Sequence, residues 1–122
     1  ARSYDDQYAW LRERTDPDAD LERAFLDYLH ERKLRLPDHA QYRPDDEVMV
    51  QADFYYDRRS GGMAAALPGA CVFVDGPTHD RPEQRAHDLE IRDELRDRGF
   101  RVIAVRYDRD FAALVAEYPD VF

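Results

Sequence analysis

The sequence predicts an α/β fold in which a mixed β-sheet is flanked by helices. Apolar residues recur at helical spacing in some segments and at strand spacing, or as short unbroken runs, in others. These segments follow one another in the order α-β-β-β-α-β-α, which is typical of a sheet with helices packed on it. A length of 122 residues suits a single domain. We divide it into an N-terminal extension (1–18), a core (19–107) and a C-terminal helix (108–122).

The first long helix is predicted over residues 19–34. Asp18 or Asp20 is placed to cap its N-terminus, and Pro37 closes the segment. Residues 10–11 (Trp-Leu) belong to a shorter preceding helix that covers one end of the core. One face of the long helix carries apolar residues at the spacing i, i+3, i+4, i+7 and i+8, namely Leu21, Ala24, Phe25, Tyr28 and Leu29.

Four segments are predicted to form strands. Residues 47–56 alternate with the period of 2 that a strand requires. Residues 70–74 are an unbroken apolar run, which is typical of a buried central strand. Residues 39–43 and 100–107 complete the sheet. Residues 57–69 contain Gly and Pro breakers and are expected to form a connection.

The second long helix is predicted between the third and fourth strands. Asp80 and Glu83 have the spacing of a capping box, with Asp80 in place of the usual hydroxyl residue. Pro82 suits the first turn of a helix, and Gly99 ends the helix as a C-terminal cap. A final short helix places three apolar residues on one side: Phe111, Leu114 and Val115.

The charge balance bears on which partners are expected. Asp and Glu number 27 against 18 Lys and Arg, which gives a formal net charge of −9, and Lys33 is the single lysine. A composition rich in Asp and poor in Lys is typical of halophilic proteins, although a GC-rich genome also favours Arg over Lys. An acidic surface normally argues against nucleic-acid binding, because that binding needs cations that neutralise phosphates. In a halophile the acidity is an adaptation to the solvent and says little about partners.

Composition also excludes several classes of protein. No run approaches the roughly 18 apolar residues of a transmembrane helix, and the N-terminus lacks the apolar stretch of a signal peptide. Cys71 is the single cysteine, which excludes an internal disulfide framework and a Cys-based zinc site. We therefore expect a soluble cytoplasmic domain without a membrane partner.

Two aspartates are candidate site residues because of their positions in predicted strands. Asp53 lies within a strand of otherwise apolar and aromatic residues, and Asp75 ends the buried strand. If these strands pair, both carboxylates lie at the same end of the sheet. Hard oxygen ligands at such a spacing suit Mg²⁺, which usually takes one or two carboxylates. The alternative is structural, with Asp53 at a strand edge and Asp75 in an Asx-turn with Gly76.

Glu22 and His79 are the other candidates. Glu22 lies one position off the apolar face of the first long helix, so it could point toward Asp53 and Asp75, or be a solvated acid in the first turn. His79 follows Asp75 by four residues, where it could act as a general base near a phosphate or simply be a surface residue. The remaining histidines show no metal-ligand spacing: His30, His39 and His87.

Arginines in the second long helix form another pattern with two interpretations. They could form a basic strip that follows a phosphate backbone. They alternate with acidic residues, which favours a solvated helix face with exposed ion pairs. The arginines are Arg81, Arg85, Arg92, Arg96 and Arg98.

Three blocks of sequence resemble the motifs of a nuclease family. They are residues 22–25 (ERAF), 51–56 (QADFYY) and 72–79 (VFVDGPTH), and they are similar to the three motif blocks of the very-short-patch-repair endonuclease branch (Vsr-like) of the PD-(D/E)XK nuclease superfamily. Residues 82–103 resemble the helix and final strand of the same branch. The resemblance covers residues 19–107 and implies a restriction-endonuclease-like αβββαβ core, which coincides with the order of elements deduced above.

The resemblance also implies roles for the candidate residues. Asp53 would be the metal-binding aspartate, and Asp75 would stand where relatives hold a carboxylate or a histidine. The backbone carbonyl of Val74 would be a further ligand. Glu22 would orient a metal-bound water, and His79 would be the general base or a phosphate contact. The implied reaction is hydrolysis of a DNA phosphodiester assisted by Mg²⁺ or Mn²⁺.

The sequence departs from the family's pattern in several places. Ala52 stands where the name motif has Pro, and Phe73 stands where many relatives place a glutamate. No lysine lies two positions after an acid on the third strand. The zinc ligands and the aromatic wedge of the mismatch-repair enzymes are also missing, so a T:G mismatch is not expected as the substrate.

A second resemblance concerns the larger protein to which this domain could belong. Residues 71–84 and 101–108 are similar to the C-terminal end of large prokaryotic DEAD/DEAH-box helicases, in which a nuclease-like module follows the motor. A motor in the same polypeptide would supply the DNA affinity that this acidic chain lacks, and no ATP-binding loop is present here. The first hypothesis is therefore a metal-dependent endonuclease domain of a helicase in DNA repair or phage defence, with a homodimer as one arrangement. The alternative is a catalytically inactive module for DNA docking or protein interaction.

Overall fold

The computed structural model describes residues 2–16, 19–58 and 68–122, apart from the side chains of Thr78 and His79. Its helices are α1 (Tyr4–Arg14), α2 (Asp20–Glu31), α3 (Pro82–Asp97) and α4 (Phe111–Glu117), with a short 3-10 helix, η2, at Pro77–Asp80. Its strands are β1 (His39–Tyr42), β2 (Ala52–Tyr56), β3 (Ala70–Asp75) and β4 (Arg101–Arg106). The α/β class and the mixed sheet flanked by helices are confirmed.

The four strands form one sheet in the order β1-β2-β3-β4. The first three strands are antiparallel neighbours, with Phe54 of β2 opposite Val72 of β3. Strands β3 and β4 are parallel, with Val72 opposite Ile103, so α3 is the crossover between them. This register brings the start of β2 beside the end of β3, which is the end of the sheet where the predicted acidic residues lie.

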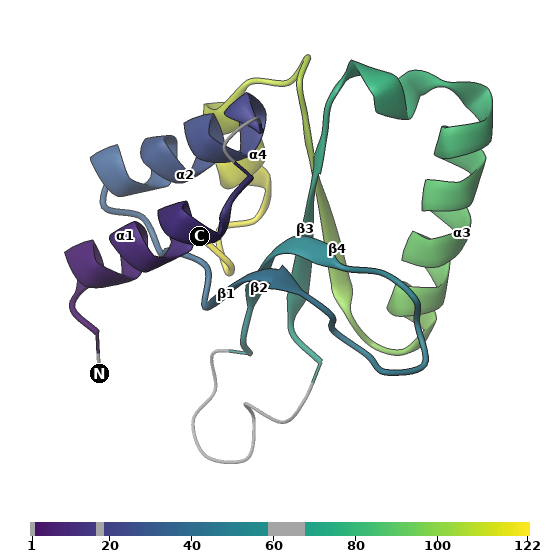
Figure 1. Ribbon diagram of the computed structural model, residues 1–122, viewed down its shortest axis with the longest axis horizontal. Coiled ribbons are helices and arrows are strands. Elements are labelled where there is room, and N and C mark those ends of the chain that lie inside the picture. Colours follow the sequence, from purple (N-terminus) through teal and green to yellow (C-terminus); the bar gives the residue numbers. More distant parts are fainter. Residues whose placement is uncertain (1, 17–18, 59–67) are drawn as a thin grey trace.

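Helices cover both faces of the sheet, with α1, α2 and α4 on one side and α3 on the other (Figure 1). Leu29 of α2 and Val72 of β3 belong to the larger hydrophobic cluster on the first side. Cys71 and Phe73 of β3 belong to the cluster around Leu95 of α3. Successive side chains of a strand point to opposite faces, so burial of both faces explains why the sequence of β3 is an unbroken apolar run.

The second strand is shorter than predicted, because it begins at Ala52 rather than at residue 47. The carboxylate of Asp45 accepts a hydrogen bond of 2.8 Å from the backbone N–H of Glu47, and the Asp45 carbonyl accepts one from Val48. These contacts hold the segment in a turn, as is usual for an Asx residue. Val48 is buried all the same, so its apolar character reflects core packing and not strand pairing.

The predicted caps of two helices are wrong. Ala19 is the N-cap of α2 and makes no side-chain hydrogen bond, and Asp20 is the first helical residue. Helix α3 begins at Pro82 with Arg81 as its N-cap, so Asp80 does not cap it. The Asp80 carboxylate instead accepts hydrogen bonds of 2.7 Å from Arg106 and from the Tyr107 hydroxyl at the end of β4.

The C-terminal end of α3 is as predicted. Gly99 has a φ of +96°, a left-handed conformation that favours glycine and ends the helix. The predicted breakers Gly61 and Gly62 lie outside the described residues. Of the helices in the described part of the chain, none combines the length and the apolar character that crossing a lipid bilayer requires.

Candidate active site

A cavity of about 330 Å³ lies where β2 begins and β3 ends, and we call it the carboxylate cavity. Its polar lining residues come from α2, β2, β3, α3 and the segment before β2, and they are Glu22, Gln51, Asp53, Asp75, Asp88 and Arg92. Its other lining residues are Val50, Phe73, Val74 and Ile91. The structure therefore brings together three of the four predicted catalytic residues, which are far apart in the sequence.

Asp53 is held in place by the backbone of the neighbouring strand. Its Oδ2 accepts a hydrogen bond of 2.7 Å from the backbone N–H of Val74. A bond from a backbone amide fixes the orientation of the carboxylate without adding a counter-charge from a side chain. Val74 itself lines the cavity, and the role of its carbonyl as a metal ligand stays a prediction.

Glu22 is buried next to Asp53. Its side chain shares a hydrogen bond with Asp53, and its Oε1 accepts one of 3.1 Å from Nε2 of Gln41. Burial, and then the charge of Asp53 and their shared hydrogen bond, raise the pKa of Glu22 from 4.5 to about 8. The alternative of a solvated acid in the first turn is wrong, because only 8% of Glu22 is exposed.

Gln41 is a residue of the site that sequence reasoning missed. It has a φ of +52° although it lies within β1, an uncommon conformation for a residue other than glycine. Its carbonyl accepts a hydrogen bond of 2.7 Å from Nε2 of Gln51, and its amide reaches Glu22. Backbone strain of this kind concentrates at functional sites. The strain cannot be deduced from residue type, because glutamine has no preference for this region.

Asp75 forms a bidentate ion pair with Arg92 of α3. Nη1 of Arg92 donates to Oδ2 at 2.8 Å, and Nη2 donates to Oδ1 at 2.7 Å. The guanidinium also lies 4.7 Å from the centre of the Phe73 ring. Asp75 is buried and only 11% of the Arg92 side chain is exposed, so the prediction of a solvated helix face is wrong at Arg92. It is confirmed at Arg96 and Arg98, which form partly exposed ion pairs.

A signal for the burial of Arg92 was present in the sequence. It precedes the buried Leu95 by three residues, so the two lie on the same face of α3. Asp88 lies four residues before Arg92 and also lines the cavity. These two residues complete the polar lining from the α3 side.

His79 lies in η2, directly after β3. Its side chain lies outside the described residues, so its predicted role as general base or phosphate contact stays a prediction. The other histidines are placed elsewhere. For example, His30 pairs with Asp5 and His39 with Asp57.

The carboxylate cavity fits a divalent cation held by two side chains. Within residues 2–16, 19–58 and 68–122, no three His, Cys, Asp or Glu side chains are grouped so that they could hold a metal ion. Mg²⁺ usually needs one or two carboxylates and completes its shell with water and substrate oxygens. Glu22 and Asp53 supply such a pair of hard ligands. Their shared hydrogen bond and the raised pKa of Glu22 favour a proton between the two carboxyl groups, at a position that a cation could take instead.

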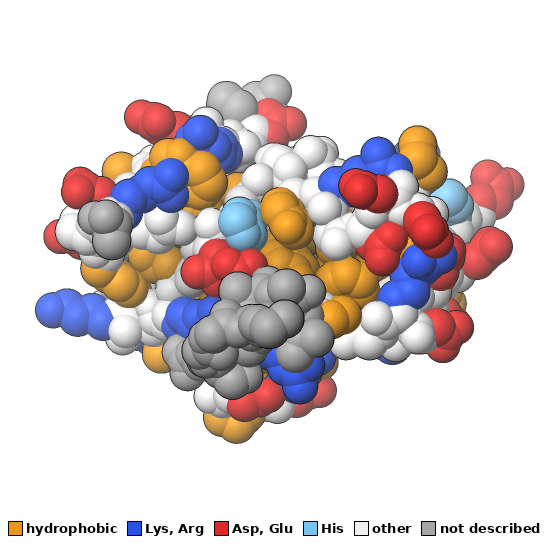
Figure 2. Space-filling view, turned by 90° about the horizontal axis from the view of Figure 1, so that it is seen from below, with side chains coloured by type: hydrophobic (Ala, Val, Ile, Leu, Met, Phe, Trp, Pro, Cys, Tyr) orange, Lys and Arg blue, Asp and Glu red, His pale blue; other side chains and the backbone are white. Residues whose placement is uncertain are grey.

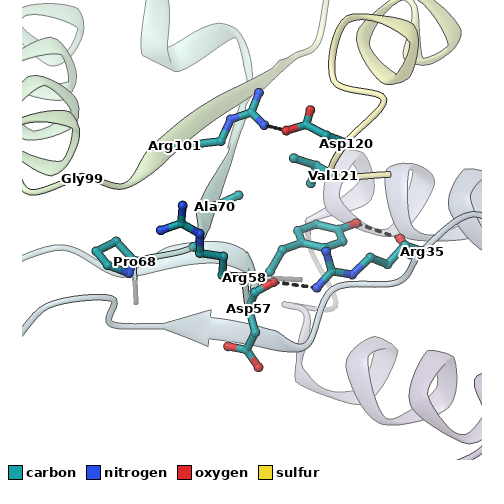
Figure 3. Close-up of a pocket in the computed structure, with 11 residues that line it drawn as sticks. Arg35, Asp57, Arg58, Pro68, Ala70, Gly99, Arg101, Asp120 and Val121 are labelled. Atoms are coloured by element: carbon teal, nitrogen blue, oxygen red, sulfur yellow. Dashed lines mark hydrogen bonds and ion pairs between the residues drawn. The ribbon is translucent and has the colours of Figure 1, made fainter. Parts of the chain in front are cut away.

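A larger cavity, of about 510 Å³, lies at the opposite end of the sheet and is shown in Figure 3. We call it the arginine cavity because Arg35, Arg58 and Arg101 line it. Arg35 donates to the carboxylate of Asp38 and to the carbonyl of Asp57, and Arg101 pairs with Asp120. None of the predicted site residues lines this cavity.

The likeness of residues 22–25, 51–56 and 72–79 to nuclease motifs stays a prediction. No protein-family model, curated protein or solved structure matches the chain.

Proposed function

We propose that this chain is a nuclease domain that hydrolyses DNA phosphodiester bonds with the help of Mg²⁺ or Mn²⁺ held by Glu22 and Asp53. The observation that carries the proposal is the contact between these two carboxyl groups. They come from α2 and β2, and they meet within a cavity that also holds Asp75 and Arg92.

Two adjacent carboxylates are costly to keep in a partly buried position. They repel each other, and burial disfavours the charged form of each. A structural role would be served better by a neutral pair, such as two amides or two apolar residues. Their presence here favours a functional role, in which a divalent cation replaces the shared proton.

Each polar residue of the cavity has its own role in the proposed reaction. A bound divalent cation supplies a water of lowered pKa and neutralises charge on the phosphate. The N–H of Val74 holds Asp53, and the amide of Gln41 holds Glu22, so both carboxylates are oriented before any ligand binds. Glu22 positions the attacking water. His79, which follows Asp75 by four residues, is proposed to take up or deliver a proton.

Tight DNA binding needs more positive charge than this chain carries, so the chain alone is expected to bind DNA weakly and at low salt. The formal net charge is −9. On the face seen in Figure 2, described basic side chains are interspersed with acidic and apolar ones and form no continuous basic stripe. We therefore propose that a helicase motor in the same polypeptide supplies most of the affinity for the phosphate backbone.

A second candidate function is a nuclease-fold module without catalysis that serves DNA docking or protein interaction. The ion pair between Asp75 and Arg92 favours it, because the charge of Asp75 is already balanced by an arginine and attracts a cation less. Phe73 also favours the inactive module, because it stands where many members of the resembled nuclease family place a glutamate.

Metal titration and plasmid cleavage distinguish the two functions. We expect the wild type to bind Mn²⁺ in isothermal titration calorimetry and to cut supercoiled plasmid DNA, and Asp53→Ala to lose both properties. Asp93→Ala is the matched control, since it removes the same charge from an exposed position on α3. Equal cutting by the wild type and Asp53→Ala would rule out the nuclease, and DNA binding without any cutting would support the inactive module.

A further inference from the structure

Arg92 is the single Lys or Arg among the described residues that line the carboxylate cavity. A phosphodiester that entered this cavity would meet Glu22, Asp53, Asp75 and Asp88, all of which repel it when ionised. A cationic group that faces the phosphate is therefore needed in addition to the metal. The geometry of Arg92 suits that task.

Arg92 carries more hydrogen-bond donors than its ion pair with Asp75 uses. The guanidinium has five N–H donors in one plane, and Asp75 takes two of them, one from Nη1 and one from Nη2. The other three are the N–H of Nε and the second N–H of each Nη. The ring of Phe73 lies against the group and limits its rotation. Arg92 is thus held in one orientation and has donors with which it can bind a phosphate that enters the cavity.

We propose, on the basis of the proposed nuclease function, that Arg92 binds the phosphate of the substrate and that Asp75 orients Arg92 instead of binding the metal. Arginine matches phosphate well because it can donate two parallel hydrogen bonds, and the N–H of Nε with the outer N–H of the adjacent Nη forms such a pair beside the one that Asp75 uses. Asp75 is a positioning residue in this arrangement, and the metal is held by Glu22 and Asp53.

The competing explanation is purely structural. A buried bidentate ion pair also fastens α3 to the end of β3, and loss of one partner leaves an unpaired buried charge. Variants must therefore separate substrate binding from folding. The double variant Asp75→Asn/Arg92→Gln removes both charges together and keeps side chains of similar size, so it is expected to fold even where Arg92→Gln alone does not.

The experiment compares Asp75→Asn, Arg92→Gln, Arg92→Lys and the double variant with the wild type. We expect Mn²⁺ affinity, measured by calorimetry, to stay within about 2-fold in all of them. We expect plasmid cleavage to fall roughly 10- to 100-fold on loss of the charge-assisted contact. The double variant should lose no more than Arg92→Gln, because both changes remove the same contact. Arg92→Lys keeps the positive charge, so its KM should lie between those of the wild type and Arg92→Gln, while its cleavage rate should stay below that of the wild type.

Salt dependence gives a readout that a structural role would not change. Binding of a short DNA duplex is measured with Ca²⁺ in place of Mg²⁺ at several salt concentrations. Loss of one phosphate contact should reduce the slope of log affinity against log salt by about 1. An unchanged slope and an unchanged KM in folded Arg92 variants would overturn the proposal.

The outcomes also separate this proposal from the nuclease function. If Asp75→Asn weakens Mn²⁺ binding 10-fold or more while the wild type cuts DNA, Asp75 is a metal ligand and only the proposal about Arg92 fails. If the wild type neither binds Mn²⁺ nor cuts DNA, the nuclease function fails, and an effect of Arg92→Gln on the salt slope still supports a phosphate contact. If the wild type does not bind DNA either, both fail.

Discussion

The two ends of the β-sheet carry charge in opposite ways. At the carboxylate cavity, Glu22 lies against Asp53, and the pKa of Glu22 is raised to about 8. At the arginine cavity, Arg35 pairs with Asp38 and Arg101 pairs with Asp120 (Figure 3). Both ends bring together residues from separate elements and both contain ion pairs, but the carboxylate cavity also holds two acidic side chains, Glu22 and Asp53, against each other.

This difference supports the proposal that the carboxylate cavity is the functional end of the sheet. Matched pairs at the arginine cavity connect elements: Arg35 joins the segment after α2 to the end of β2, and its carbonyl accepts a hydrogen bond of 3.0 Å from the Tyr56 hydroxyl. At the carboxylate cavity, Glu22 and Asp53 also join two elements, but their burial side by side costs stability whenever both are ionised. Such a cost is expected where a site must bind an ion or a substrate.

The largest expected difference between the two ends appears when one carboxylate is removed from each of them in turn. Asp53→Ala should abolish Mn²⁺ binding and lower plasmid cleavage by about 100-fold or more, because the proposed metal site would lose one of its two protein ligands. Asp120→Ala, at the arginine cavity, should leave metal binding and cleavage within about 2-fold of the wild type. Calorimetry and a cleavage time course measure both. A comparable loss in Asp120→Ala would show that the two ends do not differ in function.

The pH dependence of stability tests the strain at the carboxylate cavity directly. Folding raises the pKa of Glu22 from its ordinary value of 4.5 to about 8, so folding binds a proton between these limits. The stability present below about pH 4.5 is therefore lost as pH rises toward 8. We expect the free energy of unfolding of the metal-free protein to fall by roughly 2 to 4 kcal/mol over this range.

Glu22→Gln should remove this loss, because glutamine does not ionise. The variant is expected to be more stable than the wild type at pH 8, and to bind Mn²⁺ less tightly. Glu13→Gln on the exposed side of α1 is the control and should keep the wild-type profile. Urea unfolding at several pH values with a chelator present measures the difference. A rising or flat profile in the wild type would contradict the crowding of Glu22 and Asp53.

Sequence periodicity predicted the parts of the fold that depend on local pattern. The apolar run of residues 70–74 identified a strand buried on both faces, and Asp75 marked the C-terminal end of that strand. Asp53 was conspicuous because a charged residue interrupts an apolar strand. Glu22 was expected to point toward them as one of two alternatives, and the structure decides between these.

Features that depend on distant partners were not predicted. Asp80 was expected to cap a helix, but Arg106, which lies 26 residues further along the chain, forms an ion pair with it. Arg92 was assigned to a solvated face, because a pattern of alternating charges does not show which arginine meets Asp75. The conformation of Gln41 also follows from its tertiary contacts and not from its residue type.

A smaller effect is expected from the strained backbone of Gln41. Gln41→Gly should relieve a positive φ, a gain of up to about 1 kcal/mol, and lose a hydrogen bond of similar value, so that stability changes little. Mn²⁺ affinity should fall severalfold, because Glu22 is no longer oriented.

The control is Lys33, which has a φ of +55° and lies beyond α2, away from the cavity. Lys33→Gly should therefore stabilise the protein by about 0.5–1 kcal/mol without changing Mn²⁺ affinity. Equal Mn²⁺ affinities in the two variants would remove Gln41 from the site.

The smallest effect is expected at the arginine cavity itself. The side chains of Arg101 and Asp120 are 44% and 66% exposed, so solvent screens their attraction and their ion pair should contribute less than about 1 kcal/mol. Arg101→Gln is expected to lower the urea midpoint only slightly, and this small loss should shrink further in high salt. The same variant should leave Mn²⁺ affinity and the pH profile of stability unchanged, because the opposite end of the sheet holds its charges independently. A change in either property would mean that the two ends are coupled through the strands. The contrast between an end that connects elements and an end proposed to bind a cation would then no longer hold.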